Sequence, residues 1–224
     1  MEKNKIQTSE TFCIGAFLAI AGGYLDAYTY LMRGGVFANA QTGNIVLLGI
    51  NIMEKDFVKA FSYLVPIGFF MIGIFVANII KNTHRLSAIH WRQVVLGIEI
   101  LGVIGVGLLP MGRLDFLANA LVAFVCSLQV ESFRKVNGLA FASTMCTGNL
   151  RSGTAAAFDG IWLRQKSHFE KSGKYFGVVG FFILGGIIGA FASKYLGGTG
   201  VFWAAIPLLV ALLIMFEEEK PVSR

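Results

Sequence analysis

Thr42-Gly43-Asn44 recurs as Thr147-Gly148-Asn149, at an offset of 147 − 42 = 105 residues, and this repeated tripeptide, the TGN motif, decides the fold. Each copy lies near the start of a short, weakly apolar stretch between longer apolar segments. An acid and an aromatic residue precede both copies at the same distance: Asp26 with Tyr28, and Glu131 with Phe133. The pattern predicts an internally duplicated membrane protein in which two matching helix breaks mark a solute site.

Composition supports the membrane class. Of the 224 residues, 55% are hydrophobic and only 14% are charged, and the mean hydropathy is +0.68. A soluble domain needs more charge to cover its surface. Alternating strand patterns are absent, so we expect helical spans rather than a barrel. We predict a single membrane domain over residues 1–224, made of two repeats at about 11–110 and 116–216.

Eight apolar segments follow one another along the chain. Six are long enough to approach the roughly 20 residues that span a bilayer; these are Phe12–Met32, Phe61–Ile80, Val94–Pro110, Phe116–Val130, Tyr175–Ser193 and Gly200–Phe216. Two are shorter and contain the TGN motifs, namely Ala38–Ile52 and Ser143–Phe158. The topology depends on whether these two stretches cross the membrane.

Loop charge favours re-entrant TGN stretches. The net charge is +6, and the basic residues lie in connecting loops, which indicates the positive-inside rule rather than a nucleic-acid partner. With eight crossings, the basic loop Lys81–Arg92 would lie opposite the basic N-terminus. With six crossings, this loop, residues Arg134–Lys174 and both termini share the cytoplasmic side. We therefore predict six transmembrane crossings plus two re-entrant half-helices, arranged as inverted repeats, and eight full crossings remain the alternative.

Two stretches carry a family resemblance. Gly-Gly-Tyr-Leu-Asp-Ala-Tyr at 22–28 and Gly-Gly-Val-Phe-Ala-Asn-Ala-Gln-Thr-Gly-Asn at 34–44 resemble the signature of the YoaK-like family, domain of unknown function 1275. The second TGN motif, followed by Leu150-Arg151, fits as well. The resemblance implies a multi-spanning protein of the bacterial inner membrane and supplies no activity. The layout is also similar to the sulfate-permease and nucleobase-transporter fold at about half its length, an architectural analogy only.

The TGN motifs are the candidate solute site. Their glycines permit unusual backbone conformations, and their Thr and Asn side chains are good N-caps. A helix that starts inside the membrane presents free N–H groups and a positive dipole end, which suits anions or carbonyl groups. The expected solute-binding residues are Thr42, Gly43, Asn44, Thr147, Gly148, Asn149, Gln41, Asn39 and Arg151. The alternatives are that TGN only caps and packs the helices, and that Arg151 is a cytoplasmic anchor.

Three acids are candidates for proton coupling. Asp26 and Glu131 lie near the ends of apolar helices, and Glu99 lies inside one. An acid within a membrane helix is costly and usually faces a cavity or a partner, so it is suited to binding and releasing a proton. The alternative for Asp26 and Glu131 is local capping or an ion pair, which nearby Arg134 favours for Glu131. For Glu99 the alternative is burial against a polar partner.

Other sequence features point away from catalysis. Cys13, Cys126 and Cys146 are isolated, and the histidines lie in basic loops, so we expect no metal and no cofactor. No nucleophile–base pattern or phosphate loop is present, so we expect no enzyme. The expected function is secondary transport of a small polar or anionic solute by a homodimer in the lipid bilayer. A channel or facilitator, and a non-transporting scaffold or sensor, remain alternatives. Gly185 and Gly189 suit close helix packing or dimerisation.

Overall fold

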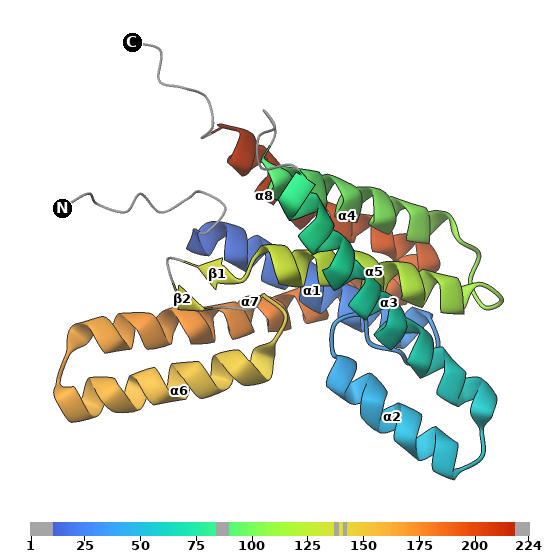
Figure 1. Cartoon of the computed structure of the whole chain (residues 1–224), viewed down its shortest axis with the longest axis horizontal. Coiled ribbons are helices and arrows are strands. Elements are labelled where there is room, and N and C mark those ends of the chain that lie inside the picture. Colours follow the sequence, from blue (N-terminus) through green and yellow to red (C-terminus); the bar gives the residue numbers. More distant parts are fainter. Residues whose placement is uncertain (1–10, 84–89, 137–138, 141–142, 218–224) are drawn as a thin grey trace.

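A computed structural model describes residues 11–83, 90–136, 139–140 and 143–217 (Figure 1). The helices are α1 Phe12–Met32, α2 Gln41–Met53, α3 Phe57–Thr83, α4 Trp91–Leu108, α5 Asp115–Ser132, α6 Cys146–Leu163, α7 Lys166–Leu196 and α8 Ala205–Glu217. A 3-10 helix, η2 Gly197–Ala204, joins α7 to α8. Strands β1 Lys135–Val136 and β2 Leu139–Ala140 pair antiparallel. The predicted helical class is confirmed, apart from this short β pairing.

Within the described residues, five stretches are long and apolar enough to cross a membrane. They are α1, α3, α4, α5 and the continuous run from α7 to α8. Neither TGN helix is among them, and α2 has only 13 residues. The predicted last segment, Gly200–Phe216, is divided between the end of η2 and α8. Gly197, with a positive φ of 58°, ends α7 before it.

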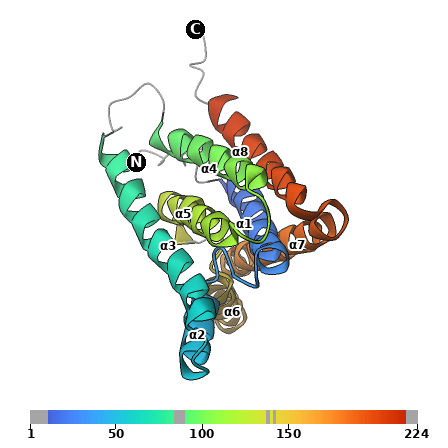
Figure 2. The same cartoon turned by 90° about the vertical axis from the view of Figure 1, so that its right-hand side faces the viewer.

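Helices α1 and α5 lie at the centre of the molecule (Figure 2). Helix α1 packs along α7, while α5 packs along α3. The pairs α2 with α3, and α6 with α7, form antiparallel hairpins. In terms of the predicted repeats, the first helix of each half packs against the third helix of the other half. The main helix contacts therefore run between the two predicted halves rather than within each of them.

Glycines allow α1 and α7 to touch through their backbones. A Cβ atom at Gly23 would overlap the carbonyl oxygen of Phe182, and one at Gly185 would overlap the carbonyl oxygen of Ile20. Gly189 faces the backbone of Tyr24 in the same way. The Gly185–Gly189 pair therefore serves close packing of α7 on α1, one of the two uses predicted for it.

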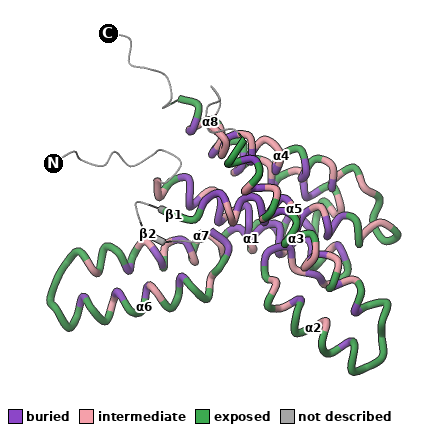
Figure 3. Tube along the Cα trace, in the orientation of Figure 1, coloured by how far each residue is buried: buried purple, intermediate pink, exposed green. Residues whose placement is uncertain are grey.

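The two TGN helices extend away from this centre. Helices α2 and α6 run toward opposite ends of the molecule (Figure 1). Both are exposed along most of their length, whereas α1 and α5 are buried (Figure 3). In α2 only Asn44 and Asn51 are buried. The exposed side chains of α2 include Ile45, Val46 and Ile50, an apolar face suited to lipid or to another protein.

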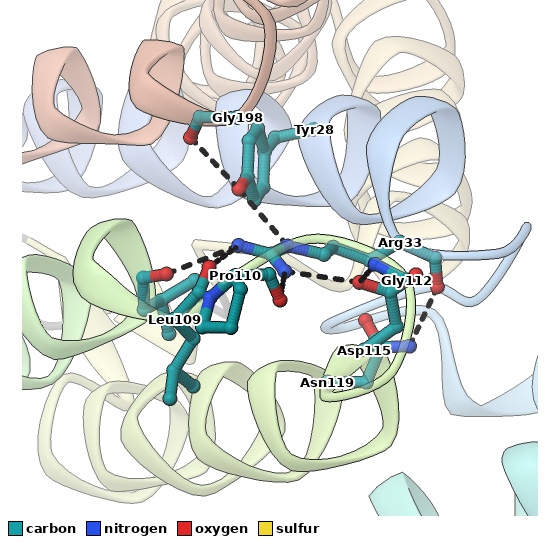
Figure 4. A network of polar contacts seen from close by, with 9 residues as sticks. Tyr28, Arg33, Leu109, Pro110, Gly112, Asp115, Asn119 and Gly198 are labelled. Carbon is teal, nitrogen blue, oxygen red and sulfur yellow. Dashed lines mark hydrogen bonds and ion pairs between the residues drawn. The ribbon is translucent and has the colours of Figure 1, made fainter.

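Arg33 links the C-terminal end of α1 to the C-terminal end of α4 through hydrogen bonds (Figure 4). The side chain is 1% exposed and lies 2.9 Å from Asp115 Oδ1. Its guanidinium also donates to Tyr28 Oη and to the carbonyl oxygens of Val106, Leu109 and Pro110, at 2.9–3.1 Å. Asn119 Nδ2 donates to the Arg33 carbonyl at 2.8 Å. The buried charge is thus fully paired, and it satisfies carbonyls that the end of α4 leaves free.

Candidate functional site

A cavity of about 850 Å³ lies where the starts of α2 and α6 meet α1, α3, α5 and α7. Its polar lining comes from the TGN regions and from α1, namely Asp26, Asn39, Gln41, Thr42, Thr144 and Thr147. Its apolar lining includes the rings of Tyr30, Phe37, Phe70 and Phe182. Two motifs that lie 105 residues apart in the sequence (147 − 42) therefore line one cavity. A solute site shared by both motifs would need this arrangement.

Both TGN helices begin just before the motif. Helix α2 starts at Gln41 after the N-cap Ala40, and α6 starts at Cys146 after the N-cap Met145. Neither start has a side-chain capping hydrogen bond. The expectation that TGN threonines or asparagines cap these helices is therefore wrong, because the motif already lies inside the first turn. At the start of α2 the N–H groups of Gln41 and Gly43 already donate to the carbonyls of Asn39 and Ala40, at 2.8 and 2.9 Å, so the start of α6 offers more N–H groups to a ligand or water.

The TGN glycines also differ from expectation. Gly43 and Gly148 both lie within helices, and the positive-φ glycines of the described residues are at 34, 35, 112 and 197. A Cβ at Gly43 would meet the ring of Phe37, with the nearest atoms 3.1 Å apart. A Cβ at Gly148 would meet nothing within 4 Å, and Gly148 lines the cavity. Gly148 therefore differs from Gly43 in the open space beside its Cα atom and not in its backbone conformation.

Asp26 joins α1 to the loop that precedes α2. Its side chain is 7% exposed, and Oδ1 accepts a hydrogen bond from the Asn39 backbone N–H at 2.6 Å. It lines the cavity, and it is the one acid among the described lining residues. Asp26 therefore holds the approach to α2, which is the local role considered from the sequence, and it also faces the cavity, while its role in proton coupling stays a prediction.

Asn39 brings an unsatisfied acceptor to the same wall. It is 9% exposed and lines the cavity. Its Nδ2 donates to the Gly22 carbonyl at 3.3 Å, while Oδ1 is buried without a hydrogen-bond partner among the described residues. An unpaired buried oxygen is costly, and this one lies behind the accessible surface of the wall, so a solute in the cavity does not reach it.

Asn44 has a different environment from Thr42. It is fully buried, and it bonds to the backbone of Phe37 through both amide atoms. Asn149 is buried at the corresponding place in α6. Neither residue is among the described residues that line the cavity. The TGN motif thus places its threonine toward the cavity and its asparagine toward the protein interior.

Comparison with known proteins places the chain in a family. The family described as "Protein of unknown function (DUF1275)" matches residues 14–215. The chain is a DUF1275 protein. It is 28% identical over 144 residues to the UPF0700 transmembrane protein YoaK of Bacillus subtilis, a match that spans 61% of this chain and 63% of that relative. No solved structure matches the chain. The YoaK-like resemblance is confirmed, and the likeness to sulfate permeases remains an analogy.

The remaining predicted residues of this DUF1275 protein lie elsewhere. Glu131 lies in the last turn of α5, and its Oε1 is 3.5 Å from the guanidinium Nη1 of Arg134. Arg151 is exposed on α6. Among the described residues, Glu131, Glu99 and Arg151 are not part of the cavity lining. Asp26 is the one predicted coupling acid that the structure places there.

Glu99 belongs to a separate buried cluster. It is fully buried in α4. In the amide orientation that satisfies both neighbours, Gln129 donates to Glu99 Oε1 at 2.9 Å and accepts from Ser143 Oγ at 2.8 Å. Glu99 therefore has the polar partner considered from the sequence, although that partner is Gln129 rather than a TGN amide. The cluster links α4, α5 and the approach to α6.

The sequence did not reveal the aromatic wall of the cavity. Tyr30 and Phe37 stack with ring centroids 4.8 Å apart, and Phe70 and Phe182 complete the wall. An aromatic residue in a membrane segment gives no sign of whether it faces lipid, protein or a cavity. Of these four aromatic residues, Phe37 is the one that the sequence could have indicated, because it belongs to the stretch that resembles the family signature. No group of three metal-ligating side chains occurs in the described part of the DUF1275 protein.

Proposed function

We propose that this membrane protein is a secondary transporter of a small polar or anionic solute. The observation that carries the proposal is that the starts of α2 and α6, together with Asp26, line one cavity. Discontinuous helices whose N-termini point at a common site are typical of transporter binding sites. The positive ends of their dipoles favour a negative or carbonyl oxygen at that site.

The arrangement of the hairpins supports alternating access. Helices α2 and α6 start at the cavity and run to opposite ends of the molecule. In the proposed topology, six crossings surround two re-entrant half-helices, and the halves are inverted repeats. A small movement of one hairpin relative to the other would then open the cavity toward one side and close it toward the other.

Asp26 is the proposed coupling residue. It lies at the cavity wall and bonds directly to the loop before α2. A change in its protonation alters the hydrogen bond to the Asn39 N–H, and so links proton binding to the position of that loop. Transport in this proposal takes place in the bacterial inner membrane, with both termini cytoplasmic.

A homodimer is part of the proposal. The hairpins that would move expose apolar side chains, including Ile45 and Val46 on α2 and Ile161 and Trp162 on α6. A second copy packed on part of these surfaces would give the moving elements a fixed support. Cross-linking in native membranes would reveal the pair.

The test is solute flux into proteoliposomes. A panel of sulfate, benzoate, acetamide and benzamide covers small and large solutes with and without charge. Gly148→Leu fills open space at the cavity wall, whereas Gly49→Leu adds the same side chain to α2 where nothing lies within 4 Å and outside the described lining. We expect Gly148→Leu to abolish the flux of a transported solute and Gly49→Leu to preserve it. Flux that Gly148→Leu leaves unchanged would remove the cavity from the transport path.

A further inference from the structure

We infer that the cavity takes an uncharged solute with an apolar body, an N–H donor and a carbonyl acceptor, such as a primary or secondary amide, in preference to an anion. The inference rests on the proposed function and narrows its solute class. It follows from three parts of the cavity wall that demand different chemistry from the same ligand.

The first part of the cavity wall favours a hydrogen-bond acceptor on the ligand. The starts of α2 and α6 lie at the cavity without side-chain caps, and the helices have 13 and 18 residues. The first-turn N–H groups of α6 favour an oxygen acceptor, whereas in α2 those of Gln41 and Gly43 already donate to backbone carbonyls. A carbonyl oxygen satisfies this requirement as well as a carboxylate does in hydrogen-bonding terms, so the helix starts alone do not select an anion.

The second part of the cavity wall favours a hydrogen-bond donor on the ligand and disfavours a negatively charged ligand. The Asp26 carboxyl lies at the cavity wall, where its Oδ1 accepts from the Asn39 N–H. The described lining contains no Lys or Arg that would offset the charge of Asp26. Two like charges in a poorly solvated site repel strongly. A ligand N–H group, in contrast, can donate to the Asp26 carboxyl.

The third part accommodates an apolar body. Tyr30 and Phe37 stack at 4.8 Å, and Phe70, Ile74 and Phe182 lie on the same cavity. A strongly hydrated inorganic anion would lose water against this wall without replacement hydrogen bonds. The volume of about 850 Å³ also falls in the range of about 300–1,000 Å³ that is common for small-molecule sites.

Four probes separate these requirements. Benzamide has both the ring and the amide, benzoate has the ring with a negative charge, acetamide has the amide without the ring, and sulfate has neither. Binding to the purified full chain in detergent is measured by isothermal titration calorimetry at one alkaline pH, where benzoate and sulfate are fully charged. We expect benzamide to bind most tightly, acetamide more weakly, and benzoate and sulfate weakest.

Asp26→Asn is expected to improve the binding of benzoate, and a misfolded variant would not show improved binding. Asn retains a side-chain oxygen that can accept from the Asn39 N–H, so the loop contact can persist. Removing the charge should improve benzoate binding relative to benzamide by about tenfold. Glu131→Gln is the matched control, because Glu131 lies outside the described lining, and it should leave this ratio unchanged.

Each contrary result is informative. Benzoate or sulfate binding as tightly as benzamide to the folded wild type would overturn the inferred solute class, as would an absence of binding by all four probes. Flux of an anion that Gly148→Leu abolishes would overturn the solute class while sustaining transport. Benzamide binding without flux of any panel member would sustain the site and count against the transporter.

Discussion

Asn44 holds the backbone of Phe37 through both ends of its side-chain amide. Its Oδ1 accepts from the Phe37 N–H at 3.1 Å, and its Nδ2 donates to the Phe37 carbonyl at 2.8 Å. Helix α2 thereby fixes the path of the loop that brings Phe37 and Asn39 to the cavity. The pairing makes the asparagine of the TGN motif a structural support for the binding wall.

Asn44→Ala should therefore destabilise the protein. The change leaves the N–H and the carbonyl of Phe37 without their partner, at a cost of about 1–3 kcal/mol. Asn51→Ala is the control in the same helix, because Asn51 bonds only locally to the Leu47 carbonyl at 2.7 Å. Thermal unfolding in detergent would compare the two variants. If both variants lost the same thermal stability, the hydrogen bonds between Asn44 and Phe37 would contribute no more than a local side-chain bond.

Arg33→Met should be among the most damaging single changes. It leaves Asp115 without its cation and frees several carbonyls at the end of α4, and breaking a buried pair in this way costs about 3–5 kcal/mol. Arg134→Met provides the comparison, since Arg134 is 72% exposed and its contact to Glu131 is 3.5 Å long. That variant should lie within about 0.5 kcal/mol of wild type. Chemical denaturation measured by circular dichroism would separate these expectations.

Close packing between α1 and α7 gives a third expectation. Gly23→Ala places a methyl group against the backbone of Phe182, and overpacking of this kind costs about 1–3 kcal/mol. Gly180→Ala lies on the same helix as Phe182 but meets nothing within 4 Å. It should be neutral or stabilising by about 0.5–1 kcal/mol. If the two variants unfolded at the same temperature, the helices would have to be further apart than described.

The six-crossing topology can be tested by chemical labelling. Single cysteines at Ile52→Cys and His168→Cys, in a background without Cys13, Cys126 and Cys146, mark the far ends of the two hairpins. These ends lie toward opposite ends of the molecule (Figure 1). An impermeant maleimide should label them from opposite sides of the membrane. Labelling of both from one side would contradict the inverted repeats.

Coupling distinguishes the proposed transporter from a channel. In Asp26→Asn proteoliposomes, a solute should still move down its own gradient, while accumulation driven by a proton gradient should be lost. Paired measurements with and without the gradient test this directly. A wild-type protein that never accumulates solute against its gradient would be a channel or passive facilitator instead.

The segment pattern was predicted well from the sequence. The first segment, Phe12–Met32, agrees with α1 at both ends, and the two TGN stretches became α2 and α6. Helix length and hydropathy are properties of the local chain, so they could be read without the fold. The contribution of both motifs to one cavity also followed from their repetition.

The roles of equivalent residues were harder to predict. Asp26 and Glu131 share the same offset, yet one lines the cavity and the other pairs with Arg134. The connections differ, because positive-φ glycines 34 and 35 redirect the chain after α1, whereas the β1–β2 pairing follows α5. The direction of a polar side chain depends on such loop paths, which apolar periodicity does not determine.

The exchanged packing of the two halves constrains how the chain is assembled during synthesis. Helix α1 emerges first, and its main partner α7 emerges only after five other helices. Until then, the glycine-lined face of α1 has no backbone to contact. The two halves, expressed as separate polypeptides, should therefore recover a native structure only when they are made together.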